Sequence, residues 1–97
     1  MVRRVIWAEL AIDDKFHILH YWDKRNKSKK YSIKLNGLLK NAANVVGNYP
    51  FMGKKTEVPN IRIKIVKDYF LVYEIVKDKI LILRIWDTRR NPNKLMY

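Results

Sequence analysis

The chain has 97 residues, 48% of them hydrophobic, and carries 21 Lys and Arg against nine Asp and Glu, for a formal net charge of +12. This length allows one domain, residues 1–97, and the hydrophobic content excludes a disordered chain. The absence of Cys excludes disulfide frameworks and thiolate metal sites, and no stretch approaches the roughly 20 apolar residues of a membrane span. We therefore expect a cytoplasmic protein with no membrane partner.

Positive charge is spread evenly along the chain. Residues 1–50 hold 10 basic and 4 acidic side chains, and residues 51–97 hold 11 and 5, so the charge does not form a basic tail. A folded domain this positive attracts polyanions, and the net charge exceeds the range that is useful for solubility alone. The charge therefore favours nucleic acid or an acidic protein as the partner.

The first half of the chain is expected to form a strand and two helices. Residues 2–7 (VRRVIW) have strand composition, and after them the apolar spacing becomes helical. The polar stretch 23–30 breaks this helix, and Ser28 is the expected N-cap of a second helix that ends at Gly47. Two helices with so short a connection form an antiparallel hairpin.

The second half is expected to form a loop followed by three strands. Two prolines and Gly53 predict a loop over 48–60, after which the apolar period changes to two. Strands are predicted at 61–66, 70–76 and 80–86, joined by three-residue connections as an antiparallel meander. The order β-α-α-β-β-β predicts an α+β fold, in which an antiparallel sheet carries the helical hairpin on one face.

Alternating side chains in these strands predict two different faces of the sheet. With three-residue connections, one face is apolar and lies under the helices, and the other is open, basic and aromatic. The residues predicted under the helices are Ile61, Ile63, Ile65, Leu71, Tyr73, Ile75, Leu81, Leu83 and Ile85. The open face is predicted to include Arg62, Lys64, Phe70, Arg84 and Trp86. Such a face is suited to hold a phosphate backbone and a base, although Arg62 opposite Glu74 predicts a cross-strand ion pair.

The last strand delivers a charged cluster at its end. The apolar run 80–86 (ILILRIW) is followed at once by Asp87, Arg89 and Arg90. Because the strand is a core strand, the cluster behind it is held in position. Asp87 is expected to orient the turn by pairing with Arg89 or Arg90.

No cofactor or metal site is predicted. His17 and His20 are spaced i, i+3 on the first helix, but with Asp13 as the only nearby carboxylate we expect ordinary surface histidines. Asp13 and Asp14 are interpreted as compensation of the helix dipole. The segment GKKT (53–56) lacks the earlier glycine and the preceding strand of a phosphate-binding loop, so its lysines predict only unspecific phosphate contact.

Three segments resemble the RelE/ParE superfamily of toxins from bacterial type II toxin–antitoxin modules. They are YWDKRNKSKKYSIKL in the helical half, NIRIKIVKDYFLVYEI across the middle strands and LRIWDTRRNP at the end. The resemblance covers nearly the whole chain and implies the small, basic β-α-α-β-β-β fold of that family. It also implies a cognate antitoxin whose C-terminal segment wraps the toxin.

The resemblance implies one of two activities. RelE-like members enter the ribosomal A site and cut mRNA, whereas ParE-like members inhibit DNA gyrase and have lost the nuclease residues. The nuclease uses a lysine pair spaced i, i+2, an arginine that opens the next strand, an arginine past the final strand and a C-terminal tyrosine. These positions correspond here to Arg62 and Lys64, Phe70, Arg89 and, near the C-terminus, Leu95.

Of these two activities, we slightly favour ribosome-dependent mRNA cleavage, with Arg62, Lys64 and Arg89 as the catalytic residues that stabilise the phosphorane. The predicted nucleic-acid-binding residues are Lys54, Lys55, Phe70, Arg84 and Arg90. Phe70 in place of an arginine, together with the missing tyrosine, favours the alternative, a non-catalytic inhibitor of DNA gyrase. A third hypothesis is a basic RNA- or DNA-binding module without toxicity.

Overall fold

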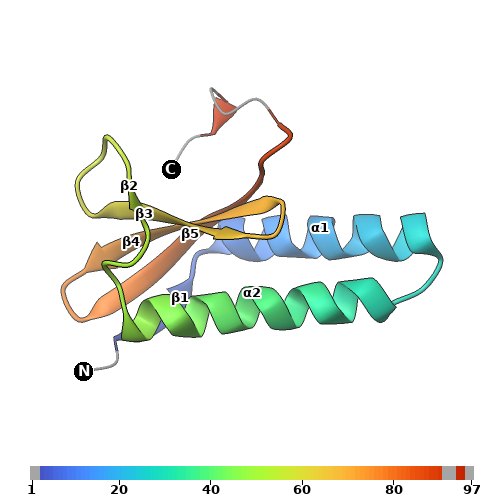
Figure 1. Ribbon diagram of the computed structural model, residues 1–97, viewed down its shortest axis with the longest axis horizontal. Coiled ribbons are helices and arrows are strands. Elements are labelled where there is room, and N and C mark those ends of the chain that lie inside the picture. The colour runs from blue at the N-terminus through green and yellow to red at the C-terminus, as the bar shows by residue number, and fades with distance from the viewer. Residues whose placement is uncertain (1–2, 91–93, 96–97) are drawn as a thin grey trace.

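The computed structural model describes residues 3–90 and 94–95 and has two layers, a sheet and a helical hairpin (Figure 1). The elements in chain order are β1 (Arg4–Trp7), α1 (Glu9–Asn26), α2 (Lys30–Asn48), β2 (Lys54–Lys55), β3 (Ile61–Val66), β4 (Tyr69–Val76) and β5 (Lys79–Asp87). The predicted order is confirmed, and the expected loop contains one additional short strand, β2.

The helical hairpin is closed by local hydrogen bonds at its turn. α1 ends at Lys27, which adopts a left-handed conformation with φ of 50°. The cap position of α2 is Lys29, one residue beyond the predicted Ser28, although the Ser28 hydroxyl still accepts a 3.2 Å hydrogen bond from the Lys30 N–H. The Ser32 hydroxyl lies within hydrogen-bonding distance of both the Asp23 carboxylate and the Lys29 carbonyl oxygen, and so joins the two helices.

Among the described residues, no helix combines the length and apolar character needed to cross a bilayer.

The sheet is mixed, with the strand order β1-β5-β4-β3-β2. β1 lies parallel to β5, and the remaining neighbours are antiparallel. The parallel pair is possible because the helical hairpin carries the chain from β1 back across one face of the sheet, as a parallel pair requires.

The main core lies between this face and the hairpin. Large side chains from both layers are fully buried there, among them Leu35 and Leu39 of α2 and Leu71, Tyr73 and Ile82 of the sheet. Tyr73 also carries a polar group into the core. Its hydroxyl donates to the Pro50 carbonyl oxygen at 2.7 Å and accepts from the Gly53 N–H at 3.0 Å, which fixes the loop after α2.

The predicted face of β3 is wrong, because the turn between β3 and β4 has two residues and not three. Val66 pairs with Tyr69, and Lys67 adopts a φ of 55° in the turn. A shift of one residue in register moves every side chain to the other face. Arg62 therefore pairs with Tyr73 on the helix side, the predicted Arg62–Glu74 pair does not form, and Ile65, expected in the core, is 63% exposed.

In β5 the predicted face is wrong in the first half and right in the second. A two-residue turn also joins β4 to β5, so Ile80 and Ile82 occupy the core positions expected for Leu81 and Leu83. A bulge then restores the phase, because Tyr73 pairs with Ile82 while Val72 pairs with Arg84. Ile85 is consequently in the core, as predicted.

Candidate functional site at the end of β5

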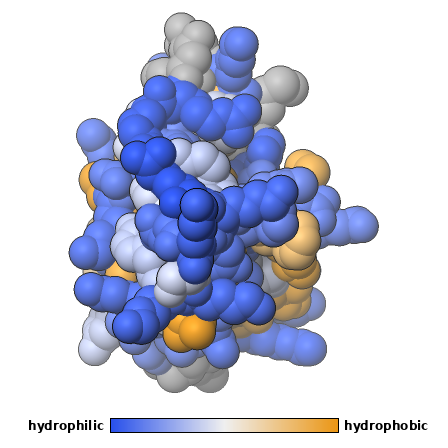
Figure 2. Space-filling model, turned by 90° about the vertical axis from the view of Figure 1, so that its right-hand side faces the viewer, coloured by the Kyte–Doolittle hydropathy of each residue, from blue (hydrophilic) through white to orange (hydrophobic). Residues whose placement is uncertain are grey.

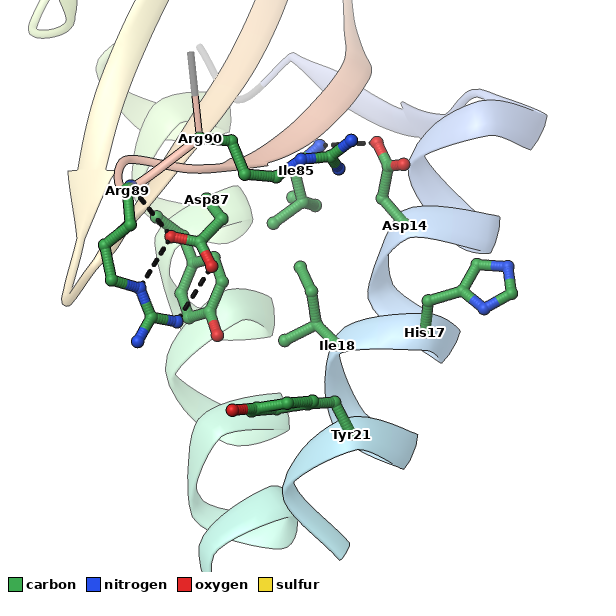
Figure 3. Close-up of a pocket in the computed structure, with 9 residues that line it drawn as sticks. Asp14, His17, Ile18, Tyr21, Ile85, Asp87, Arg89 and Arg90 are labelled. Carbon is green, nitrogen blue, oxygen red and sulfur yellow. Dashed lines mark hydrogen bonds and ion pairs between the residues drawn. The ribbon is translucent and has the colours of Figure 1, made fainter. Parts of the chain in front are cut away.

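A cleft of about 460 Å³ lies between α1 and the end of β5. It is lined by Asp14, His17, Ile18, Tyr21, Tyr69, Ile85, Asp87, Arg89 and Arg90. Figure 3 shows the α1 side chains on one wall and the charged end of β5 on the other. The cleft thus combines aromatic and apolar surface with charges of both signs.

Asp14 joins the two walls of the cleft. Its carboxylate accepts two hydrogen bonds from the Arg84 guanidinium, at 2.7 and 3.0 Å, and one from the Ile85 backbone N–H at 3.1 Å. Both side chains are mostly buried, and the hydrogen bond to Asp14 raises the pKa of Arg84. This pairing makes Arg84 a neutralised cation. From the sequence Asp14 was expected only to compensate the helix dipole, because no spacing rule links residues 70 positions apart.

Asp87 and Arg89 form the second ion pair of the cleft. Asp87 accepts from the Arg89 guanidinium at 3.0 and 2.8 Å and from the Arg89 backbone N–H at 2.9 Å, as the dashed lines of Figure 3 indicate. The prediction that Asp87 orients this turn is confirmed. The hydrogen bond from Arg89 lowers the pKa of the Asp87 carboxyl. Because Arg89 remains half exposed, its outer face is open to a partner.

Tyr69 belongs to the cleft and was not identified from the sequence. Its side chain is 2% exposed, and its hydroxyl accepts a 2.8 Å hydrogen bond from the Trp22 indole N–H. Burial raises the pKa of the Tyr69 hydroxyl, which favours its neutral form. The predicted strand begins at Phe70, which leaves Tyr69 in the turn. The high strand propensity of tyrosine was the signal that could have placed Tyr69 in the strand.

The three predicted catalytic residues do not meet at one point. Arg62 donates to the carbonyl oxygens of Phe51 and Gly53, at 3.0 and 2.9 Å, and stacks on the Phe51 ring. Lys64 shares its face of the sheet, since it pairs with Leu71. Arg89 lies beyond the other end of these strands, where the Thr88 N–H bonds the Asp68 carbonyl. The four-residue step from Arg62 to the end of β3 alone spans about 13 Å.

The predicted nucleic-acid-binding residues fall into two groups. Lys54, Lys55 and Phe70 line a hollow of about 400 Å³ beside β2 and β3. Arg84 and Arg90 flank the Trp86 ring, with guanidinium carbons 5.7 and 4.6 Å from its centroid. The first group is the one that brings free lysines and an aromatic ring together.

The histidines of α1 are not clustered with other metal ligands. Within residues 3–90 and 94–95, no group of three or more His, Cys, Asp and Glu side chains could hold a metal ion. His20 stacks on Phe16, with ring centroids 5.9 Å apart. His17 is among the residues that line the cleft, but its ring points away from Asp87 and Arg89 (Figure 3).

Comparison with known proteins gives a consistent result. Residues 5–92 match the model of the family described as ParE toxin of type II toxin–antitoxin system, parDE. A chain from the solved structure "Chromosomal ParDE TA system from P. aeruginosa" superposes with a TM-score of 0.76, covering 89% of this chain and 96% of that one at 17% identity. At this identity the likeness concerns the fold. No curated protein sequence matches the chain.

Proposed function

Because the chain belongs to the ParE toxin family of type II toxin–antitoxin systems, we propose that it stops bacterial growth by binding and inhibiting DNA gyrase, without cutting RNA. Gyrase inhibition is the activity that the superfamily resemblance implies for ParE-like members. The family match favours this branch over the RelE-like nuclease that the sequence alone placed first.

The orientation of β3 is the observation that carries the proposal. Arg62 and Lys64 point to the helix side of the sheet, whereas Phe70, in the position of a nuclease arginine, pairs with Ile65 and Trp86 on the opposite side. RNA cleavage by a neighbouring 2′-hydroxyl needs a base, cations on the phosphorane and an acid around one phosphate. Side chains on opposite faces cannot share one phosphate, so this arrangement supports a non-catalytic toxin.

Ribosome-dependent mRNA cleavage is the alternative, with Arg62, Lys64 and Arg89 as its electrostatic residues. It would require these three cations to act on one phosphodiester. Arg62 is held by two carbonyl oxygens and Arg89 by Asp87, so both would first have to leave partners with good geometry.

We further propose a cognate antitoxin as the resting partner. The toxin is strongly cationic, and several large apolar side chains are exposed on its surface. They include Leu10, Ile12 and Phe16 on α1 and Tyr49, Phe51 and Met52 after α2. An antitoxin segment that combines acidic and apolar residues would cover these side chains and offset the charge.

The proposal is tested with purified toxin in two parallel assays. In a supercoiling assay, toxin added to DNA gyrase and relaxed plasmid should inhibit supercoiling in a dose-dependent way, and equimolar antitoxin should restore it. In a translating extract, the same toxin should leave a reporter mRNA uncut. Cleaved mRNA together with unaffected supercoiling would overturn the proposal.

A further inference from the structure

The closed end of the helical hairpin carries the densest run of Lys and Arg in the sequence. In Figure 1 the hairpin extends well beyond the sheet, so that the turn between α1 and α2 forms a projecting tip. Six exposed cations lie in the eleven residues around this turn: Lys24, Arg25, Lys27, Lys29, Lys30 and Lys34. Figure 2 looks onto this end and shows hydrophilic residues over its centre, with apolar residues towards its margins.

These cations are not neutralised within the chain. All 21 Lys and Arg and all nine acids lie within residues 3–90 and 94–95. The ion pairs among these residues join only Arg84 to Asp14 and Arg89 to Asp87, so none of them involves a cation of the tip. The one acid near the tip, Asp23, is engaged by the Ser32 hydroxyl. The six charges therefore face solvent together.

The start of α2 adds to this potential. Its first turn contains no acidic residue, and its cap residue, Lys29, makes no side-chain hydrogen bond to the helix. The positive end of the helix dipole therefore coincides with Lys29 and Lys30, and Lys34 lies one turn further along α2. Lysines at a helix N-terminus destabilise the free protein, so an anionic partner at the tip would relieve this repulsion as well as pair the charges.

Two aromatic side chains at the tip, Trp22 and Tyr31, are packed against each other, whereas Tyr21 is 49% exposed beside Lys24 and Arg25. Trp22 and Tyr31 form an edge-to-face pair with centroids 4.9 Å apart, and the Trp22 indole is bonded to Tyr69. Proteins that bind single strands stack bases on free aromatic rings along a basic groove. A convex tip whose turn, residues 27–30, carries cations and no aromatic ring instead suits the outer phosphates of a duplex.

We propose that this tip binds the phosphate backbone of duplex DNA, without reading its sequence. The proposal goes beyond gyrase inhibition, because the contact is made by the toxin alone. It would place the toxin on the substrate of an enzyme that acts on DNA. The side chains that carry it are the lysines at the start of α2 and those of the turn.

The test measures binding of fluorescent 20-base-pair DNA by anisotropy, without gyrase, over a series of salt concentrations. The triple variant Lys29→Gln/Lys30→Gln/Lys34→Gln should weaken duplex binding by at least about tenfold at low salt. Each phosphate contact contributes about 0.9 to the slope of log K against log salt, so the slope should fall by about 2 to 3. The variant should fold, because it removes positive charge from a helix N-terminus.

A matched control removes three charges from the opposite end of the molecule. Arg4→Gln/Lys77→Gln/Lys79→Gln has the same net charge, and its three residues are exposed near the β4–β5 turn. It should change duplex affinity less than about threefold. Equal losses in the two variants would show attraction to net charge alone and would overturn the proposal. Equal or tighter binding of a matched single strand of DNA or RNA would also overturn it. None of these outcomes depends on gyrase inhibition.

Discussion

Asp14 of α1 takes the place of a missing strand residue beside β5. β1 pairs with β5 only as far as Ile82, and the Ile82 carbonyl accepts the last backbone hydrogen bond from Ala8. Beyond that point the edge of β5 is covered by α1, where Asp14 accepts the Ile85 N–H and holds Arg84. One carboxylate therefore ties α1 to β5 and joins the two walls of the cleft.

Substituting Asp14 should destabilise the fold. Asp14→Ala leaves the mostly buried Arg84 guanidinium without its partner and the Ile85 N–H without an acceptor, so the free energy of unfolding should fall by about 2 to 4 kcal/mol. Urea denaturation followed by circular dichroism measures this. Asp13→Ala is the control, because Asp13 is exposed and makes no ion pair, and it should stay within about 0.5 kcal/mol of the parent. Similar losses in both variants would refute the role assigned to Asp14.

The buried Tyr73 hydroxyl should make stability fall at alkaline pH. Burial raises the pKa of Tyr73, so the unfolded chain releases this proton at lower pH than the folded one. Stability from this group is therefore complete below about pH 10 and is lost as pH rises towards the folded value. Tyr73→Phe should lose about 1 to 3 kcal/mol at pH 7 and a smaller amount at pH 11, measured by urea denaturation at both values. A constant difference would contradict this assignment.

Tyr49→Phe is the control for Tyr73→Phe. Tyr49 is 67% exposed, so loss of its hydroxyl should leave stability within about 0.5 kcal/mol at both pH values.

The predictability of this fold differed between its elements for identifiable reasons. Strongly periodic segments such as 61–66 and 80–86 gave the order of elements, because hydrophobic spacing is a local signal. The faces of β3 and β5 depended on turn length, and the turns Lys67–Asp68 and Lys77–Asp78 contain no glycine that would have marked a two-residue connection. The Asp14–Arg84 pair could not be predicted, since it depends on how α1 crosses the end of the sheet.

Charge at the two ends of the hairpin turn should act on stability with opposite signs. Lys30→Glu places a negative charge in the first turn of α2 and should raise the free energy of unfolding by about 0.3 to 1 kcal/mol at low salt. Lys24→Glu places the same charge in the last turn of α1 and should lower it by a similar amount. Thermal unfolding at 20 mM and 500 mM salt measures both, and the difference should shrink at high salt. Changes of the same sign would show that the dipole is not the cause.

Introducing the missing arginine should not create a nuclease. Phe70→Arg restores the cation that the RelE-like pattern has at the opening of β4, but this side chain pairs with Ile65 and Trp86, away from Arg62 and Lys64. The variant should therefore leave mRNA uncut in a translating extract, like the parent. A second variant, Ile63→Lys/Ile65→Lys/Phe70→Arg, would place its three new cations together on the face of the sheet opposite the helices, as β-strand alternation requires. If Phe70→Arg alone cut mRNA at the ribosome, the assignment of these faces to separate roles would be wrong, and cleavage would replace gyrase inhibition as the proposed activity.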